Sequence, residues 1–109
     1  MRRRWTVFIA DPARDDIARA ADYITVELAN PMAAARLLAD LEGAVETLAA
    51  HPATFRPIPF DPWKRDGFRV LPVRNYLLVF RVDEETKNVF VARLFHFRQN
   101  WLEELESLS

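Results

Sequence analysis

The sequence predicts a single domain of the α+β class that spans residues 1–109. Three observations favour this class. The first half holds two long stretches whose apolar residues recur at helical spacing, residues 11–28 and 32–50. The second half holds three consecutive runs rich in β-branched and aromatic residues, joined by short polar turns, at 68–73, 76–82 and 88–97. One more short run of that kind opens the chain, and a length of 109 residues suffices for one core.

The first element is a strand over Trp5–Ala10, a run rich in β-forming residues. The dipeptide Asp11-Pro12 then predicts a helix start. Asp11 is expected to be the N-cap, because a carboxylate accepts hydrogen bonds from the unpaired N–H groups of the first turn. Pro12 fits the first helical position, where its missing N–H is no loss. The buried face of this helix is expected to carry Ile17, Ala21, Ile24 and Leu28.

A second pair of cap and proline, Asn30-Pro31, ends the first helix and opens another. The second helix is predicted from about Met32 to Ala50. Its apolar stripe consists of Ala34, Leu37, Leu38, Leu41, Val45 and Leu48. Two long helices joined by one capped break predict an antiparallel helical hairpin, whose expected role is to form the core.

A proline-rich loop is expected to follow the hairpin. His51-Pro52 ends the second helix, and residues 51–66 contain four prolines, which keep the segment out of a helix. The aromatic residues of this loop are expected to pack it onto the domain; they are Phe55, Phe60 and Trp63.

The rest of the chain is predicted to be a three-stranded antiparallel meander closed by a short helix. The strands are expected at Phe68–Val73, Tyr76–Val82 and Asn88–Phe97, with turns at Arg74-Asn75 and Asp83–Lys87. Pro72 indicates an edge or a bulge, since proline cannot donate a hydrogen bond to a sheet. The closing helix is indicated by Trp101, Leu102 and Leu105.

Composition excludes several classes of site. The chain has no cysteine, so it forms no disulfide or thiolate metal site, and a reducing, cytoplasmic location is expected. Its two histidines stand 45 positions apart, and neither a metal site nor another cofactor is expected. Two glycines do not make a glycine-rich phosphate loop, and the only serines lie in the last three residues. No apolar segment approaches the length that crosses a membrane, so no membrane partner is expected.

Charge is divided unevenly along the chain, although the net charge is −1. Residues 1–55 contain six Lys or Arg and eight Asp or Glu, whereas residues 56–100 contain nine Lys or Arg and five Asp or Glu. The half with the predicted strands is therefore basic, and a modest positive patch is one interpretation. Ordinary solvated charges on strands and turns are the other interpretation, and the pattern leaves both open.

The candidate functional residues belong to this basic half. The strands carry Arg69, Arg81, Arg93, His96 and Arg98, and the preceding loop ends on Lys64 and Arg65. Guanidinium groups bind phosphate, and a histidine beside them can exchange a proton near neutral pH. A metal-free protein that cuts RNA would use such a set. Structural interpretations stay open too, since Arg69 can pair with an acid and His96 can be a hydrogen-bonded core histidine.

Several phrases, taken in their order and spacing, resemble the RelE/ParE family of small bacterial toxins, of the plasmid-stabilisation type. They are Pro12–Ile17, Asn30-Pro31, Ala33–Ala35, Leu48 with His51-Pro52, Gly67–Leu71, Asn75-Tyr76, and Arg93 with His96–Arg98. The resemblance covers nearly the whole chain. It implies a helical hairpin packed on a twisted antiparallel sheet. It also implies the toxin of a type II toxin–antitoxin system, wrapped and silenced by a cognate antitoxin through which oligomers can form.

That family has two mechanistic branches, and the residues favour one of them. RelE-like toxins cut mRNA on the ribosome, whereas ParE-like toxins block DNA gyrase and are not nucleases. RelE-like members often have an arginine where this chain has Leu77. They also tend to have a tyrosine near the C-terminal end, where Trp101 is the nearest aromatic residue. The resemblance therefore favours inhibition of gyrase.

Three functions stay open at this point, and whether the chain is an enzyme stays open with them. As a nuclease, it would use Arg69, His96 and Arg98 as catalytic residues. As a binding protein, it would use a patch that draws on Lys64, Arg65, Arg81, Arg93 and Trp101. As an inert homologue, it would bind only its antitoxin. The antitoxin is expected to add a helix or strand to the hairpin groove or to an open sheet edge.

Overall fold

The computed structural model describes residues 4–107, and its elements follow the predicted order with three short additions. The helices are α1 (Asp11–Asp22), α2 (Pro31–Ala50) and α3 (Trp101–Glu106). The strands are β1 (Thr6–Ile9), β2 (Arg56–Pro57), β3 (Phe68–Val73), β4 (Tyr76–Asp83) and β5 (Asn88–His96). The additions are β2, a π-helical turn at Tyr23–Glu27 and a 3-10 turn at Pro52–Thr54. None of the helices in the described range is long and apolar enough to cross a membrane.

The five strands form one sheet in the order β1-β5-β4-β3-β2. The predicted antiparallel meander of β3, β4 and β5 is confirmed, and β2 adds two residues antiparallel to β3. β1 departs from the expected arrangement, because it pairs parallel with β5, from Thr6 opposite Asn88 to Ile9 opposite Val91. Parallel pairing needs a long connection between the two strands, and the helical hairpin lies within that connection.

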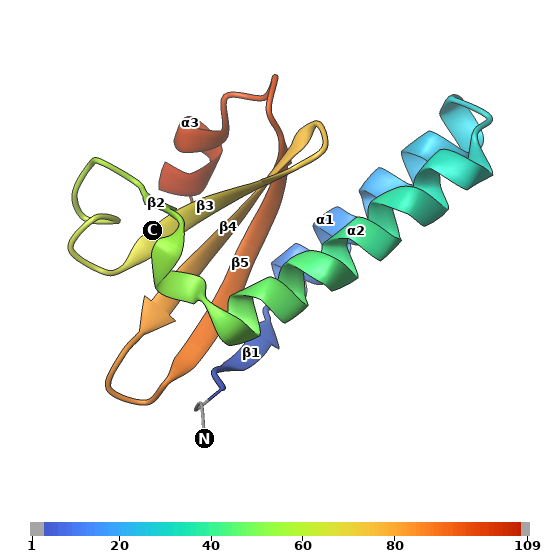
Figure 1. Cartoon of the computed structure of the whole chain (residues 1–109). Coiled ribbons are helices and arrows are strands. Elements are labelled where there is room, and N and C mark those ends of the chain that lie inside the picture. The colour runs from blue at the N-terminus through green and yellow to red at the C-terminus, as the bar shows by residue number, and fades with distance from the viewer. Residues whose placement is uncertain (1–3, 108–109) are drawn as a thin grey trace.

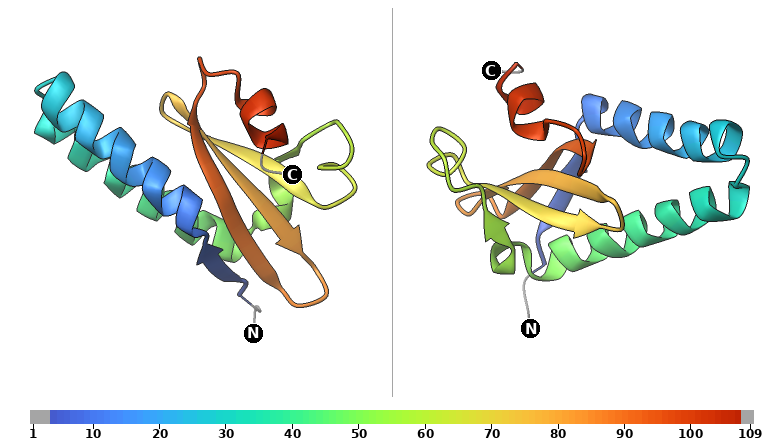
Figure 2. Two further views of the ribbon diagram at one scale, coloured as in Figure 1. Left: turned by 180° about the vertical axis from the view of Figure 1, so that it is seen from behind. Right: turned by 90° about the horizontal axis from the view of Figure 1, so that it is seen from above.

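The sheet lies between two unequal layers (Figure 1, Figure 2). The hairpin of α1 and α2 packs against one face and continues beyond the end of the sheet, and α3 covers part of the opposite face. The larger core lies between hairpin and sheet, with Leu37, Leu48, Leu78, Phe80 and Val89 among its most buried members. A smaller core lies under α3 and consists of Ile58, Trp63, Val79, Phe95 and Leu105. The predicted role of the hairpin as core scaffold is therefore confirmed.

Helix α1 differs from its prediction at both ends. Ala10 is the N-cap and makes no capping hydrogen bond through its side chain, so the prediction of Asp11 as the cap is wrong. Asp11 lies in the first turn, where its charge favours the positive end of the helix dipole. At the other end the helix gives way to the π-helical turn, and the predicted core residue Leu28 is 55% exposed. The wider turn changes the spacing on which that prediction rested.

Helix α2 agrees better with its sequence pattern. The Asn30 side chain accepts a hydrogen bond from the Ala33 N–H at 3.1 Å, which confirms the predicted cap. Most of the predicted stripe is buried or half-buried, and Leu38 is the exception. Leu38 lies instead at a small apolar cavity of about 220 Å³ that α1, α2 and the sheet enclose together.

The proline-rich loop is only partly packed in the expected way. Trp63 is buried in the smaller core, and the ring of Phe55 stands edge-on to Phe80 with 6.1 Å between centroids. Phe60 is 53% exposed, so its predicted packing is wrong. Pro72 lies on β3 beyond the two residues that β2 covers, which confirms the predicted edge position.

Candidate functional site

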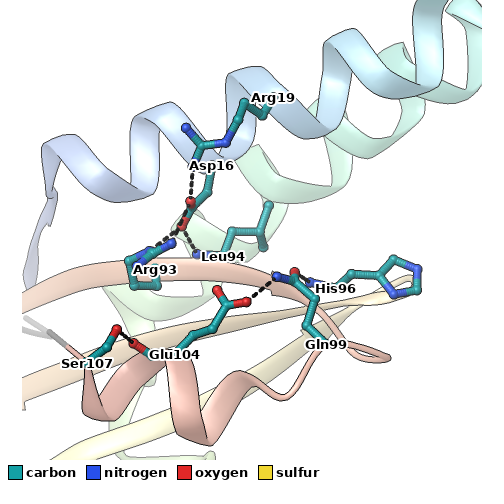
Figure 3. A network of polar contacts seen from close by, with 8 residues as sticks. All are labelled: Asp16, Arg19, Arg93, Leu94, His96, Gln99, Glu104 and Ser107. Carbon is teal, nitrogen blue, oxygen red and sulfur yellow. Dashed lines mark hydrogen bonds and ion pairs between the residues drawn. The ribbon is translucent and has the colours of Figure 1, made fainter. Parts of the chain in front are cut away.

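The candidate site forms where the sheet lacks a neighbouring strand. β1 pairs with β5 only as far as Val91, so the second half of β5 has no strand on that side. Helix α1 follows β1 directly and lies beside this half of β5 (Figure 3). At this open edge of β5, the Leu94 N–H points away from β4 and donates a hydrogen bond to Asp16 Oδ2 at 2.9 Å. A side chain of α1 thus takes the place of the missing strand as hydrogen-bond acceptor.

Asp16 and Arg93 form a buried ion pair that joins α1 to β5 (Figure 3). Arg93 donates from Nε and Nη2 to the two carboxylate oxygens of Asp16, at 2.6 and 3.0 Å. The side chain of Asp16 is 5% exposed and that of Arg93 is 15% exposed. Arg19 donates a further hydrogen bond to Asp16 at 2.7 Å. The hydrogen bond to Asp16, with the negative charges of Asp16 and Glu104, raises the pKa of Arg93 against the opposing effect of burial.

This ion pair corrects the interpretation of Arg93 as a free binding cation. Its guanidinium group is held by Asp16 and stands 4.8 Å from the centre of the Phe95 ring, so to bind a phosphate it would have to give up both hydrogen bonds to Asp16. Asp16 was not among the residues predicted from the sequence. A signal was available, because Asp16 shares a helical face with Ala13 and Ala20, and a carboxylate on a buried face needs a partner.

His96 ends β5 and is held by the turn that follows it. Its backbone N–H donates to Gln99 Oε1 at 2.7 Å, and its Nδ1 accepts from the Arg98 N–H at 3.1 Å. Nδ1 is therefore the acceptor atom of the ring, and Nε2 makes no hydrogen bond to residues 4–107 that would compete with a ligand. The ring stands edge-on to Tyr76 and stacks on Phe97, with 5.2 Å between centroids in both cases. The structural interpretation of His96 and the catalytic one are both compatible with this geometry.

A cleft of about 690 Å³ opens between α1, the end of β5 and the start of α3. It brings together three of the predicted residues, Arg93, His96 and Arg98. It also holds polar residues that the sequence analysis did not select: Asp16, Arg19, Tyr23, Tyr76, Gln99 and Glu104. Tyr76 belongs to the cleft because the register of β4 and β5 places it opposite His96. The sequence does not specify that register, so Tyr76 could not be predicted as a neighbour of His96. The cleft offers an imidazole, phenols and guanidinium groups, which can transfer a proton or bind an anion.

Tyr76 provides a test of the cleft in solution. Burial, and next the charge of Tyr23, raise the pKa of Tyr76 above its ordinary value of 10.0. The folded state holds this proton more firmly than the unfolded chain, so the stabilising effect is full below the ordinary pKa and is lost as pH rises through the folded pKa. Since the chain has two tyrosines, we expect alkaline titration of tyrosinate absorbance to show a late component that Tyr76→Phe removes.

A matched variant checks the second cause of this shift. Tyr23→Phe removes the neighbouring charge and should lower the pKa of Tyr76 without abolishing the late component. The assignment is contradicted if the late component survives in Tyr76→Phe, or if Tyr23→Phe leaves the titration of Tyr76 unchanged.

Arg69 lies far from this cleft. It is opposite Phe80 on β4, whereas His96 is opposite Tyr76. Their backbones are therefore roughly 16 Å apart, for strands that rise about 3.3 Å per residue and lie about 4.8 Å from one another. Arg69 donates instead from Nη1 to the Phe55 carbonyl at 2.6 Å. The expected catalytic set of Arg69, His96 and Arg98 is thus not assembled, and the predicted positive patch is not continuous.

The surroundings of Arg69 contain more acids than bases. A cavity of about 560 Å³ is lined there by three arginines and four acids: Arg65, Arg69, Arg81, Asp66, Asp83, Glu84 and Glu85. Arg81 stands over the Phe90 ring, 4.7 Å from its centre. Arg69 Nε is buried and has no hydrogen-bond partner within residues 4–107. Lys64 is exposed on the adjoining loop. This balance of charge does not favour a phosphate site.

The last predicted binding residue, Trp101, lies neither at the cleft nor at the cavity beside Arg69. It opens α3 and packs half-buried against the smaller core. An apolar groove of about 670 Å³ runs past it, lined also by Pro57, Pro72, Leu77 and Leu102. The predicted binding residues therefore divide among the cleft, the mixed-charge cavity and this groove. In the part of the chain that the structure describes, no three His, Cys, Asp or Glu side chains are grouped to hold a metal ion.

The sequence and the fold of this chain are similar to those of known proteins. The model of a family described as the ParE toxin of type II toxin–antitoxin systems, parDE, matches residues 7–101. No curated protein matches the chain in sequence. Several solved structures are similar to it. A structure of the chromosomal ParDE toxin–antitoxin system from P. aeruginosa has a TM-score of 0.67 and 21% identity, over 84% of this chain and 95% of that chain.

Two further structures that are similar to the chain carry the name RelE or RelBE. The RelBE2 toxin–antitoxin complex from Mycobacterium tuberculosis has a TM-score of 0.61 and 23% identity, over 85% of this chain and 98% of that chain. The isolated E. coli RelE toxin has a TM-score of 0.55 and 16% identity, over 96% of this chain and 99% of that chain. At such identities these three likenesses establish the shared fold.

Proposed function

We propose that this chain, which belongs to the ParE toxin family of type II toxin–antitoxin systems, arrests growth by binding DNA gyrase and not by cutting RNA. The observation that carries the proposal is that the predicted arginines do not all lie together at one site, as the cations of a metal-free nuclease would. Arg93 is matched by Asp16, and Arg69 lies on another part of the sheet. Cleavage of RNA needs positive charge beside the phosphorus in addition to an acid and a base.

The environment of Leu77 supports the same proposal. In the RelE-like branch this position often carries an arginine, according to the resemblance described above. Here Leu77 lines the apolar groove with Trp101 and Leu102, next to the smaller core. An apolar residue at that place supplies no charge to a phosphate, and it favours contact with an apolar partner.

Cleavage of mRNA on the ribosome is the alternative function, and one observation favours it. Tyr76, His96 and Arg98 line the same cleft, and imidazole and phenol are groups that enzymes use as general acids or bases. These residues would supply an acid or base and one cation. The two mechanisms differ in how strongly they depend on these single side chains.

Pulse labelling after controlled induction tests the proposal. We expect DNA synthesis to stop before protein synthesis, and the purified toxin to inhibit supercoiling by gyrase. His96→Ala and Arg98→Ala should each change toxicity by less than about tenfold, because a binding surface distributes its energy over many contacts. For a nuclease, loss of one charge-stabilising group would reduce cleavage about 100-fold or more.

Two results would contradict the proposal. If protein synthesis stops first and both variants are harmless to cells, the chain acts as a ribosome-dependent nuclease. If induction of the wild-type chain does not slow growth, the chain is an inert homologue that serves only to bind an antitoxin.

The cognate antitoxin is the partner that the family implies, and we propose that it occupies the apolar groove at Trp101. The groove runs from β2 to Pro72, which lies in the part of β3 that β2 leaves uncovered. The Phe68 carbonyl accepts a hydrogen bond from the Ile58 N–H, so it points away from β4. Backbone groups alternate in direction along a strand, so the backbone nitrogen of Pro72, four residues on, also points away from β4, toward the open edge. Proline has no N–H to donate there, which disfavours an added strand and favours a packed apolar helix.

A further inference from the structure

The turn of the helical hairpin exposes several large apolar side chains. Tyr23 is 54% exposed, Val26 70%, Leu28 55% and Met32 66%. We call these four residues the hairpin-tip patch. The turn between α1 and α2 lies at the end of the hairpin farthest from the sheet (Figure 1, Figure 2). Tyr23, at the start of the π-helical turn, also lines the cleft beside Tyr76, and Met32 lies in the first turn of α2. Soluble domains rarely gather so many exposed large apolar residues at one place without using them for binding.

The backbone of this turn is irregular in a way that brings these side chains to the surface. The Leu28 N–H donates to the Tyr23 carbonyl at 3.2 Å, and the Asn30 N–H donates to the Ile24 carbonyl at 3.0 Å, so the last turn is wider than an α-helical one. Ala29 has a φ of 48°, a region that costs a residue with a Cβ about 1–2 kcal/mol. π-helical turns and strained residues of this kind are frequent at functional sites.

The charged residues near the hairpin-tip patch indicate which class of partner can bind it. Between Ala20 and Ala35 the only charged residues are Asp22 and Glu27, and both are exposed. The nearest cations along the chain are Arg19 and Arg36. Within residues 20–35 the charge is therefore only negative, which repels the phosphates of nucleic acid and attracts a surface with Lys or Arg. The partner that fits is therefore a protein with an apolar pocket that has basic residues at its border.

We propose that the hairpin-tip patch is the surface through which this toxin docks onto the protein that it inhibits. The inference rests on the proposed function only in that the target is a protein. The antitoxin groove lies along β3 and α3, whereas the patch lies at the far end of the hairpin. The two contacts therefore use separate parts of the chain, and substitutions can separate them.

The first experiment removes apolar surface from the tip. Val26→Ser with Met32→Ser changes two of the most exposed apolar residues, so the fold and its urea unfolding midpoint should be unaffected. We expect binding to purified gyrase to weaken about 10- to 100-fold, which is the range for loss of central contacts in an interface. Growth arrest should be lost in parallel, while affinity for the antitoxin stays unchanged. Ala35→Ser, exposed on α2 near the tip, is the matched control and should behave as wild type.

The second experiment reverses the two acidic charges of the turn. Asp22→Lys with Glu27→Lys should slow association with gyrase about tenfold at low salt, and the difference from wild type should shrink as salt rises. Glu84→Lys is the control, since it reverses an exposed charge in the β4–β5 turn, away from the hairpin.

The outcomes separate this inference from the proposed function. If the wild-type toxin arrests growth without binding gyrase, the proposed target is wrong, and loss of arrest in the Val26/Met32 variant still supports the tip as the docking surface. Full toxicity of that variant overturns the inference. It is also overturned if the variant loses affinity for the antitoxin, or if wild-type chains associate through the tip and the variant separates them with toxicity intact. A wild-type chain that neither arrests growth nor binds gyrase overturns both proposals.

Discussion

Asp16→Ala is expected to lower the free energy of unfolding by about 3–4 kcal/mol, because it removes the carboxylate that pairs with the mostly buried guanidinium of Arg93. The same change removes the acceptor of the Leu94 N–H, which has no strand beside it. Arg93 keeps some contact with solvent, so the expected loss is near the lower end for a broken buried pair. A domain of this kind has about 5–15 kcal/mol in total. Urea unfolding followed by circular dichroism measures the loss.

Two further variants show whether the ion pair is the cause. Asp15→Ala changes the neighbouring acid, which is exposed, and should alter stability by no more than about 0.5 kcal/mol. Adding Arg93→Leu to Asp16→Ala removes the unpaired charge and should restore part of the lost stability. A loss below about 1 kcal/mol for Asp16→Ala, or no recovery in the double variant, would show that the pair does not hold α1 to β5.

Features that depend on residues close in the chain could be predicted from the sequence. Asn30 caps α2 because its side chain reaches the Ala33 N–H within one turn, and the sequence pattern contains both partners. The bounds of β3 agree with the prediction at Phe68–Val73 for a similar reason, since the Arg74-Asn75 turn ends the run of β-forming residues. Such signals are local, and tertiary packing did not override them here.

Features that depend on pairing between distant segments could not be predicted in the same way. The parallel pairing of Thr6 with Asn88 is such a feature, and no pattern within either strand specifies a partner or a direction. Strand register also decides which candidate residues meet. His96 lies opposite Tyr76 on β4, but Arg69 lies opposite Phe80, and this alone separates two residues that the resemblance had joined.

The buried face of α1 shows a different limit of sequence reasoning. Hydrophobicity selected Ile17 and Leu28, but the most buried positions belong to Ala13, Asp16 and Ala20. A charged residue occupies the middle of that face because Arg93 and the Leu94 N–H reach it from β5. Both charged residues are present in the sequence, but nothing in the sequence indicates that they form an ion pair. Hydrophobicity alone therefore predicts neither Asp16 nor its pairing with Arg93.

Gly67→Ala is expected to destabilise the fold by about 3 kcal/mol. Gly67 precedes β3 with a φ of 85°, a left-handed conformation that costs a residue with a Cβ roughly 1–2 kcal/mol. A Cβ at this position would also lie 2.7 Å from the Val82 carbonyl oxygen. That oxygen is backbone of β4, which the register with Val89 holds in place, so the contact cannot relax as a flexible side chain would. Urea unfolding measures the effect.

The other glycine of the chain is the matched control, because Gly43 lies within α2 and a Cβ added there meets nothing within 4 Å. Gly43→Ala should therefore stabilise the protein by about 0.5–1 kcal/mol, as expected for alanine in place of glycine inside a helix. The same chemical change then has opposite signs at two positions, which excludes an effect of the added methyl group itself. If Gly67→Ala is as stable as wild type, β3 does not enter the sheet through a left-handed glycine packed against β4.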